Sequence, residues 1–198
     1  MTTTKAEDNR PRCGWVPLHK DFYLVYHDTE WGTPVRDDRL MFEFLTLEAF
    51  QAGLSWEIIL KKRENFRAAF DNFDPKKVAV YDEGKIQELL VNAGIIRNRL
   101  KIRATVNNAR CFLEVAAEYG SFCDYFWSFT DGTPIVNRWK TLAEIPTSTP
   151  LSDEIARDLK QRGFKFLGTT VMYAHMQAVG MVNDHEVGCF RHSELVDV

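Results

Sequence analysis

A single acid, Glu48, stands in the segment Leu47–Trp56, which is otherwise mostly apolar. Apolar side chains precede it at three- and four-residue spacing, which predicts a helix with a wide buried stripe. On that helix Glu48 follows Phe44 by four residues and Leu45 by three, so it points toward the buried side or its rim. A buried carboxylate is costly without a partner. Two interpretations follow: a glutamate that reaches solvent or a nearby backbone group, and the floor acid of a ligand pocket with Trp56 in its aromatic wall.

Two cysteines and two histidines lie near opposite ends of the chain. Cys13 and His27 belong to the N-terminal part, and His185 and Cys189 are separated by three residues near the C-terminus. Two thiolates and two imidazoles are a standard tetrahedral set for zinc, and a single turn can fold the second pair onto one ion. Such an ion would close nearly the whole chain into a loop. We expect one structural zinc ion per chain, with no open coordination position; the alternative is two buried thiols and two hydrogen-bonded histidines.

A Gly-containing turn is expected between two helices at Ala93–Ile96, and several cations follow it. Backbone amides at the start of the second helix favour an anion. Gly94 lies in the turn, and the cations beyond it are Arg97, Arg99, Lys101 and Arg103. This arrangement predicts a grip on one phosphodiester that does not read bases. A solvated helix face beside a plain turn is the alternative.

Composition limits the class of protein. The chain has 198 residues, of which 45% are hydrophobic and 27% are charged, enough for one good core or two small lobes. Its net charge of −3 argues against an overall basic surface but permits a local basic face. No apolar run is long enough to span a membrane, and the polar start lacks the apolar centre of a signal peptide. We expect a protein with no membrane partner that is located in the cytoplasm, a compartment where disulfides are rare. Cys111 and Cys123 are therefore expected to be core residues.

The elements that must position these residues are all expected to be helices, and no strand pairs are expected. Apolar periodicity and capping residues predict helices near residues 37–53, 56–70, 83–92, 97–119, 121–129, 152–162 and 169–180, with Ser152 as one of the caps. We therefore predict an all-α fold. It would form a single domain of two packed helical lobes over residues 12–191, after a disordered leader at 1–11 and before a tail at 192–198.

Several separate motifs occur in an order that resembles one family. They are Arg12–Trp15, Tyr26–Gly32, Gln51–Trp56, Lys61–Asn65, Ala93–Arg97, Arg162–Phe166 and Val182–His185. From about Arg12 to Cys189 the chain is similar to the type I 3-methyladenine DNA glycosylases, a family of constitutive bacterial alkylation-repair enzymes. The resemblance implies a helix-hairpin-helix DNA glycosylase fold, in which a zinc site joins the N- and C-terminal segments. It also implies a monofunctional hydrolase, most simply a monomer, that flips out 3-methyladenine from alkylated double-stranded DNA, releases the free base and leaves an abasic site.

The resemblance assigns roles to single residues. Glu48 would be the catalytic residue, and Glu48, Tyr26 and Trp56 would contact the base, with Trp31 nearby. Gly53 and Leu54 would contact DNA, and Leu54 would fill the gap that the flipped nucleotide leaves.

The cysteine and histidine pairs match the zinc ligands of the family, and the turn at 93–96 matches its phosphate-binding element. Most members of the wider superfamily place a catalytic Asp after a Pro/Gly-rich hairpin, and no such Asp can be assigned here.

The chemistry of the lesion suits these residue types. Methylation at N3 leaves the attached base cationic, so its glycosidic bond is weak and a strong general acid is unnecessary. Glu48 would accept hydrogen bonds from the adenine edge and favour the cation, while Trp56 would stack on an electron-poor ring. The main alternative is a catalytically weak or inactive homologue that binds alkylated bases or DNA, for which Ala49 and Phe50 are the one hint. A zinc hydrolase is disfavoured because four protein ligands leave no place for water.

Overall fold

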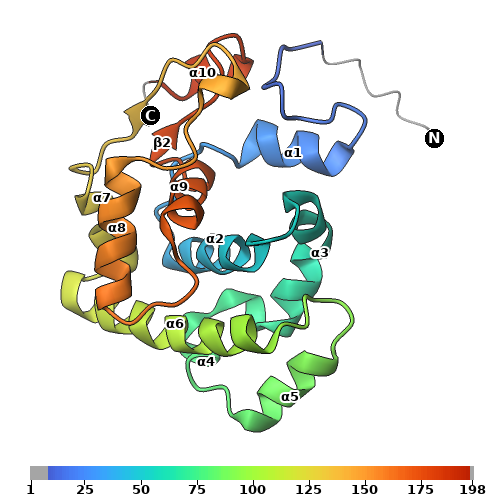
Figure 1. The fold of residues 1–198 in the computed structure, drawn as a ribbon, viewed down its shortest axis with the longest axis vertical. Coiled ribbons are helices and arrows are strands. Elements are labelled where there is room, and N and C mark those ends of the chain that lie inside the picture. Colours follow the sequence, from blue (N-terminus) through green and yellow to red (C-terminus); the bar gives the residue numbers. More distant parts are fainter. Residues whose placement is uncertain (1–8, 197–198) are drawn as a thin grey trace.

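The computed structural model describes residues 9–196, and most of this part of the chain is helical (Figure 1). Its helices are α1 (Asp21–Thr29), α2 (Asp38–Gln51), α3 (Trp56–Ala69), α4 (Pro75–Val78), α5 (Glu83–Val91), α6 (Arg99–Tyr119), α7 (Phe122–Ser128), α8 (Pro150–Gln161), α9 (Thr169–Ala178) and α10 (Phe190–Glu194), with 3-10 turns η1 (Asp71–Phe73) and η2 (Leu142–Glu144). The predicted all-α class is confirmed. None of the helices in residues 9–196 combines the length and apolar character that a bilayer crossing requires.

Helix α2 lies at the centre of the molecule and is buried on every side. In the view of Figure 1, α4, α5 and α6 lie below it and α1, α9 and α10 lie above it. Its residues from Met41 to Phe50 are all buried, and two of them are acids. Glu43 is neutralised by Arg63 and Arg67, whose guanidinium nitrogens lie 2.6 and 2.7 Å from its carboxylate. The second acid is Glu48.

A short pair of strands differs from the expectation that the chain has none. β1 (Ile135–Val136) runs parallel to β2 (Val182–Asn183), and Ile135 pairs with Val182. Two residues per strand are too few to produce a recognisable alternation in sequence, because that signal needs four or more residues. The pair ties the long loop after α7 to the segment that follows α9.

Several boundaries also differ from expectation. Thr149, and not Ser152, caps α8: the Thr149 side chain accepts from the Ser152 N–H, the Ser152 side chain accepts from the Thr149 N–H, and Pro150 occupies the first turn. At the C-terminal end the folded part continues past residue 191, because His192 and Leu195 are buried. Of the expected leader, residues 1–8 lie outside the described residues, as do 197–198 at the end of the expected tail.

Candidate functional site

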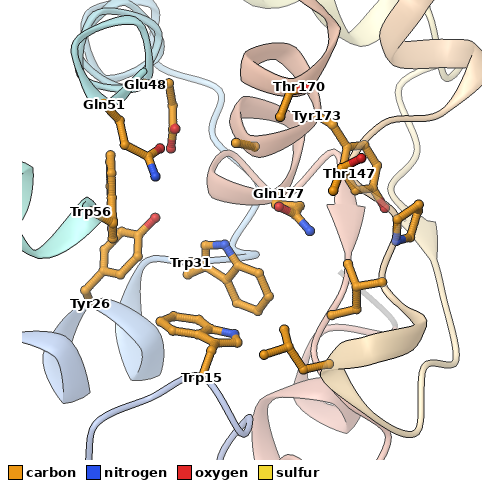
Figure 2. A pocket seen from close by; sticks show the side chains of 14 residues that line it. Trp15, Tyr26, Trp31, Glu48, Gln51, Trp56, Thr147, Thr170, Tyr173 and Gln177 are labelled. Atoms are coloured by element: carbon orange, nitrogen blue, oxygen red, sulfur yellow. The ribbon is translucent and has the colours of Figure 1, made fainter. Parts of the chain in front are cut away.

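A cavity of about 340 Å³ lies between α1, α2, α3, α9 and the loop around η2. Tyr26 comes from α1, Glu48 from α2 and Trp56 from α3, and Trp31 follows α1 (Figure 2). The structure therefore gathers around one cavity all four residues that the resemblance placed in contact with the methylated base or near it. The remaining lining residues are Trp15, Gln51, Leu142, Ile145, Pro146, Thr147, Thr170, Tyr173, Ala174 and Gln177.

Glu48 is buried and faces the cavity, as Figure 2 shows. Its Oε2 atom has no hydrogen-bond partner among the described residues, and the indole N–H of Trp56 is likewise buried and unpaired there. Burial raises the pKa of Glu48 from 4.5 to about 8, so the carboxyl is mostly protonated near pH 7. A cation in the cavity would reverse this preference, because a nearby positive charge favours the carboxylate. The site is therefore prepared to exchange a proton for a cationic ligand.

Aromatic rings form the walls beside Glu48. The rings of Tyr26 and Trp56 are 5.5 Å apart with planes inclined by 50°, and those of Trp15 and Trp31 are 4.9 Å apart at 76°. Burial, and then the nearby charge of Glu48, raise the pKa of Tyr26 above its usual value, so its phenol stays neutral. Such a surface suits a flat, electron-poor ring.

The opposite wall is held by Asp184, which sequence reasoning missed as a functional residue. Its Oδ2 accepts hydrogen bonds from the Tyr173 hydroxyl at 2.6 Å and from Gln177 Nε2 at 2.8 Å. Its Oδ1 accepts from Asn137 at 2.6 Å and from Trp139 at 2.8 Å. A carboxylate only accepts, so the amide of Gln177 is fixed with its oxygen left as an acceptor. The motif Val182–His185 contains Asp184, but two of the partners of its carboxylate, Asn137 and Trp139, lie 47 and 45 residues away in the chain.

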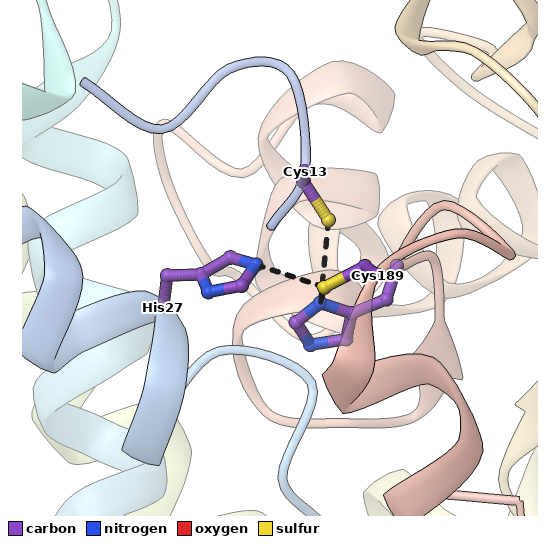
Figure 3. Close-up of side chains that lie close together, drawn as sticks. Cys13, His27 and Cys189 are labelled. Carbon is purple, nitrogen blue, oxygen red and sulfur yellow. Dashed lines mark hydrogen bonds between the residues drawn. The ribbon is translucent and has the colours of Figure 1, made fainter. Parts of the chain in front are cut away.

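The four residues of the expected metal site come together, all of them buried. The Sγ atom of Cys189 lies 3.4 Å from His27 Nε2 and 3.5 Å from His185 Nδ1, and Cys13 Sγ lies 3.4 Å from His185 Nδ1 (Figure 3). All four potential ligand atoms lie within 4.8 Å of one another. Hydrogen bonds, first from Cys13 and then from the two histidines, lower the pKa of Cys189, which favours a thiolate.

Both histidines are oriented by an acceptor on their outer nitrogen. His27 Nδ1 lies 2.8 Å from the Asp28 carboxylate, which Arg12 also holds, and His185 Nε2 lies 3.0 Å from the Trp31 carbonyl oxygen. When a metal ion is bound, the outer nitrogen of each histidine would carry the proton, and the inner nitrogen would present its lone pair to the ion. The four residues thus fit a four-coordinate metal ion, and the same Trp31 that lines the cavity lies against its shell.

The loop between α2 and α3 projects to the surface. Gly53 has a φ of +83°, a conformation that glycine adopts without strain. Leu54 follows it and is 37% exposed. A tight turn thus presents the large apolar side chain of Leu54 to solvent. The resemblance assigned a DNA contact to this residue.

The turn between α5 and α6 differs from expectation in two respects. The side-chain oxygen of Asn98 accepts from the N–H groups of Leu100 and Lys101, so it occupies the amides expected to hold an anion. Lys101 is buried and not directed at solvent, and its ammonium donates to the main-chain oxygens of Phe50, at the end of α2, and of Ala52, just beyond it. A helical side chain leans over the preceding turn, and here it meets carbonyls that a helix terminus leaves unpaired. Gly94 is partly buried in the turn, and Arg97 is exposed.

Another basic surface was missed. A groove beside α8 and the α8–α9 turn is lined by the exposed cations Arg157, Lys160 and Lys165, together with Phe166, which is 41% exposed and has a φ of +61°. The turn leads directly into α9, whose Thr170 lines the cavity. A strained, exposed aromatic residue among cations is a feature of contact surfaces for nucleic acid. Its cations lie on two segments, so the linear sequence does not show them as one cluster.

Comparison with known proteins agrees with this geometry. The model of the methyladenine glycosylase family matches residues 15–192. DNA-3-methyladenine glycosylase 1 of Escherichia coli (strain K12) is 52% identical over 178 residues, which are 90% of this chain and 95% of the relative. A crystal structure of 3-methyladenine DNA glycosylase I superposes with a TM-score of 0.88 at 52% identity, covering 91% of this chain and 98% of that one. A structure showing 3-methyladenine recognition by the Staphylococcus aureus enzyme superposes with a TM-score of 0.84 at 37% identity, covering 86% and 91%. The chain therefore belongs to the methyladenine glycosylase family.

Proposed function

We propose that this protein excises 3-methyladenine from alkylated double-stranded DNA by hydrolysis of the glycosidic bond, and leaves an abasic site. The observation that carries the proposal is the buried Oε2 of Glu48, which has no partner among the described residues and faces an aromatic cavity. A buried polar atom without a partner is rare in a folded protein and indicates a ligand that supplies the missing contact. The relatives at 52% and 45% identity carry the name of this activity.

The chemistry requires little of a general acid. The methylated base is a cation while it is attached to the sugar, and it leaves neutral, so the leaving group needs no strong proton donor. When the cation enters, Glu48 ionises, and its carboxylate stabilises the positive charge of the base at short range in a water-poor cavity. Normal adenine brings no positive charge, so it would meet a protonated Glu48 and gain no such interaction. The cavity thus favours the lesion by charge as well as by shape.

The nucleotide must leave the duplex to reach this cavity. We propose that Leu54, presented by Gly53, fills the space it vacates, and that Arg97 beside the turn at Gly94 contacts the phosphate backbone. The groove with Lys160 and Lys165 would provide a further backbone contact beside the turn that leads into α9. These surfaces are local, which is consistent with a net charge of −3.

We further propose that the metal ion at the cysteine–histidine cluster is zinc with a structural role. Tetrahedral zinc with Zn–S of about 2.3 Å and Zn–N of about 2.05 Å places sulfur and nitrogen about 3.6 Å apart. The sulfur–nitrogen distances of 3.4 and 3.5 Å in the cluster agree with this spacing. Four protein ligands leave no position for a reacting water, so the ion would hold the two ends of the chain together.

The alternative, a weak or inactive homologue, loses its only hint. Ala49 and Phe50 are buried, and the ring of Phe50 packs on Phe66 at 4.8 Å, away from the residues that line the cavity. These two residues therefore do not line the pocket.

Incubation with methylated DNA and chromatographic identification of the released base tests the proposed function. The expected product is free 3-methyladenine, and its absence would leave only a binding protein. The location in the cytoplasm and action as a monomer stay predictions.

A further inference from the structure

The ammonium group of Lys101 caps the C-terminal end of α2. Its Nζ atom donates to the carbonyl oxygens of Phe50 at 2.8 Å and Ala52 at 2.6 Å, at the point where α2 stops and the loop to Leu54 begins. These are carbonyls that a helix terminus leaves unpaired, and the negative end of the helix dipole favours a cation there. The ammonium therefore fixes the base of the loop that presents Leu54.

A second lysine makes the reciprocal contact. Lys62 lies on α3, which follows the same loop, and its Nζ donates to the carbonyl oxygens of Ala93 at 3.0 Å and Gly94 at 3.1 Å. Asn65, one turn further along α3, donates to the Gly94 oxygen at 3.3 Å. Lys101, in turn, lies on α6, the helix that follows the turn at Gly94. Each of the two surface segments is thus held by a lysine from the helix that follows the other segment.

We propose that Lys101 and Lys62 are positioning residues that lock the Leu54 loop and the Gly94 turn into one rigid DNA-facing unit. The inference rests on the proposed function, because it assumes that Leu54 enters the duplex. A loop fixed before binding loses little conformational entropy when it inserts, so preorganisation raises affinity for the flipped state. Backbone contacts at the turn would then place Leu54 at a fixed distance from the gripped phosphate.

The geometry separates this role from a direct phosphate contact. Lys101 is only 8% exposed and already donates twice to main-chain oxygens. Moving its ammonium to a phosphate would leave two carbonyls of the loop without a donor. A lysine that neutralises a phosphate contributes about one unit to the slope of log affinity against log salt, whereas a positioning lysine contributes none.

The test measures binding to a duplex that carries a tetrahydrofuran abasic-site analogue, and to the same duplex without it, over a series of salt concentrations. The single variants are Lys101→Met, Lys62→Met and Leu54→Ala. Two double variants combine Leu54→Ala with one lysine substitution each. Arg97→Gln is the matched control, because Arg97 is an exposed cation next to the same turn.

Each lysine variant is expected to lose about fivefold in preference for the abasic duplex, with an unchanged salt slope and unchanged binding of free 3-methyladenine. In the Leu54→Ala background the same substitution is expected to cost less than about twofold, because the element that it positions is gone. The control Arg97→Gln should lower the slope by about one and act independently of Leu54.

A slope lowered by about one in either lysine variant, or losses that simply add to that of Leu54→Ala, would overturn the inference. If Lys101→Met does not fold, the partly exposed Lys62 decides the question alone. If the wild type prefers the abasic duplex through Leu54 and both lysine variants keep that preference, only the positioning role is overturned. A wild-type protein that releases 3-methyladenine from methylated DNA but shows no preference for the abasic duplex overturns this inference alone. A wild-type protein that releases no 3-methyladenine overturns the proposed function and this inference with it.

Discussion

Replacing Glu48 by glutamine should remove a cost to stability that the site imposes on the fold. The carboxyl of Glu48 has a pKa of about 8 in the folded protein, against an ordinary value of 4.5 that applies when the chain is unfolded. Below pH 4.5 both states hold the proton, and the residue imposes no pH-dependent cost. As the pH rises from there to about 8, the unfolded chain releases the proton while the folded protein keeps it. The free energy of unfolding of the wild type therefore falls across this range.

The size of the effect follows from the two pKa values. Between pH 5.5 and pH 8 the wild type should lose about 3 kcal/mol of stability through Glu48, since each unit of pKa difference corresponds to about 1.4 kcal/mol. Glu48→Gln carries no titrating group at this position, so it escapes the loss. The variant should thus gain on the wild type as the pH rises, even though it gives up the carboxylate that we propose for substrate.

Urea unfolding of both proteins at pH 5.5 and at pH 8 measures this difference, because every other titrating group is shared and cancels. Glu154→Gln, at an exposed position on α8, is the control for removing a carboxylate that is not buried. If the difference between Glu48→Gln and the wild type is the same at both pH values, Glu48 is not a desolvated carboxyl, and the argument for its unpaired state is wrong.

Three further predictions concern the metal cluster and the DNA-facing loop. Cys189→Ser should abolish stoichiometric zinc binding and lower the midpoint of thermal unfolding by several degrees, measured by metal analysis and calorimetry; retention of one tightly bound zinc would exclude Cys189 as a ligand. Asp28→Asn should weaken zinc affinity by about 10- to 100-fold, because the carboxylate orients His27; a chelator competition that gives wild-type affinity would contradict this. Leu54→Ala should weaken binding to duplexes with an abasic-site analogue by about tenfold and leave binding of free 3-methyladenine unchanged; an equal loss in both measurements would show that Leu54 supports the fold instead.

Site residues that belong to a strong local sequence pattern were the most predictable. Glu48 was identifiable because the apolar spacing around it is helical, and the spacing places it among buried residues. The cysteine and histidine pairs were identifiable from ligand chemistry, although nothing in the sequence shows that the two ends of the chain meet. Their meeting depends on α1 and the last segment packing on the same side of α2, which is a tertiary property.

Lys101 shows why the remaining features were not predictable. A lysine beside a turn and among other cations suggests a surface residue, and only the position of the α2 terminus makes it a buried donor. The far wall of the cavity presents the same difficulty, because Tyr173 and Gln177 come from α9 and are oriented by Asp184 beyond it. The strands β1 and β2 contain too few residues to show a period.

Single-turnover release of 3-methyladenine from one methylated duplex, compared between the wild type and Glu48→Gln, tests most directly whether this carboxylate serves the lesion. The wild type should release the base, and the variant should be slower by about 10-fold or more while it stays folded and keeps its metal. Equal rates in the two proteins would contradict the assignment of Glu48 to the substrate.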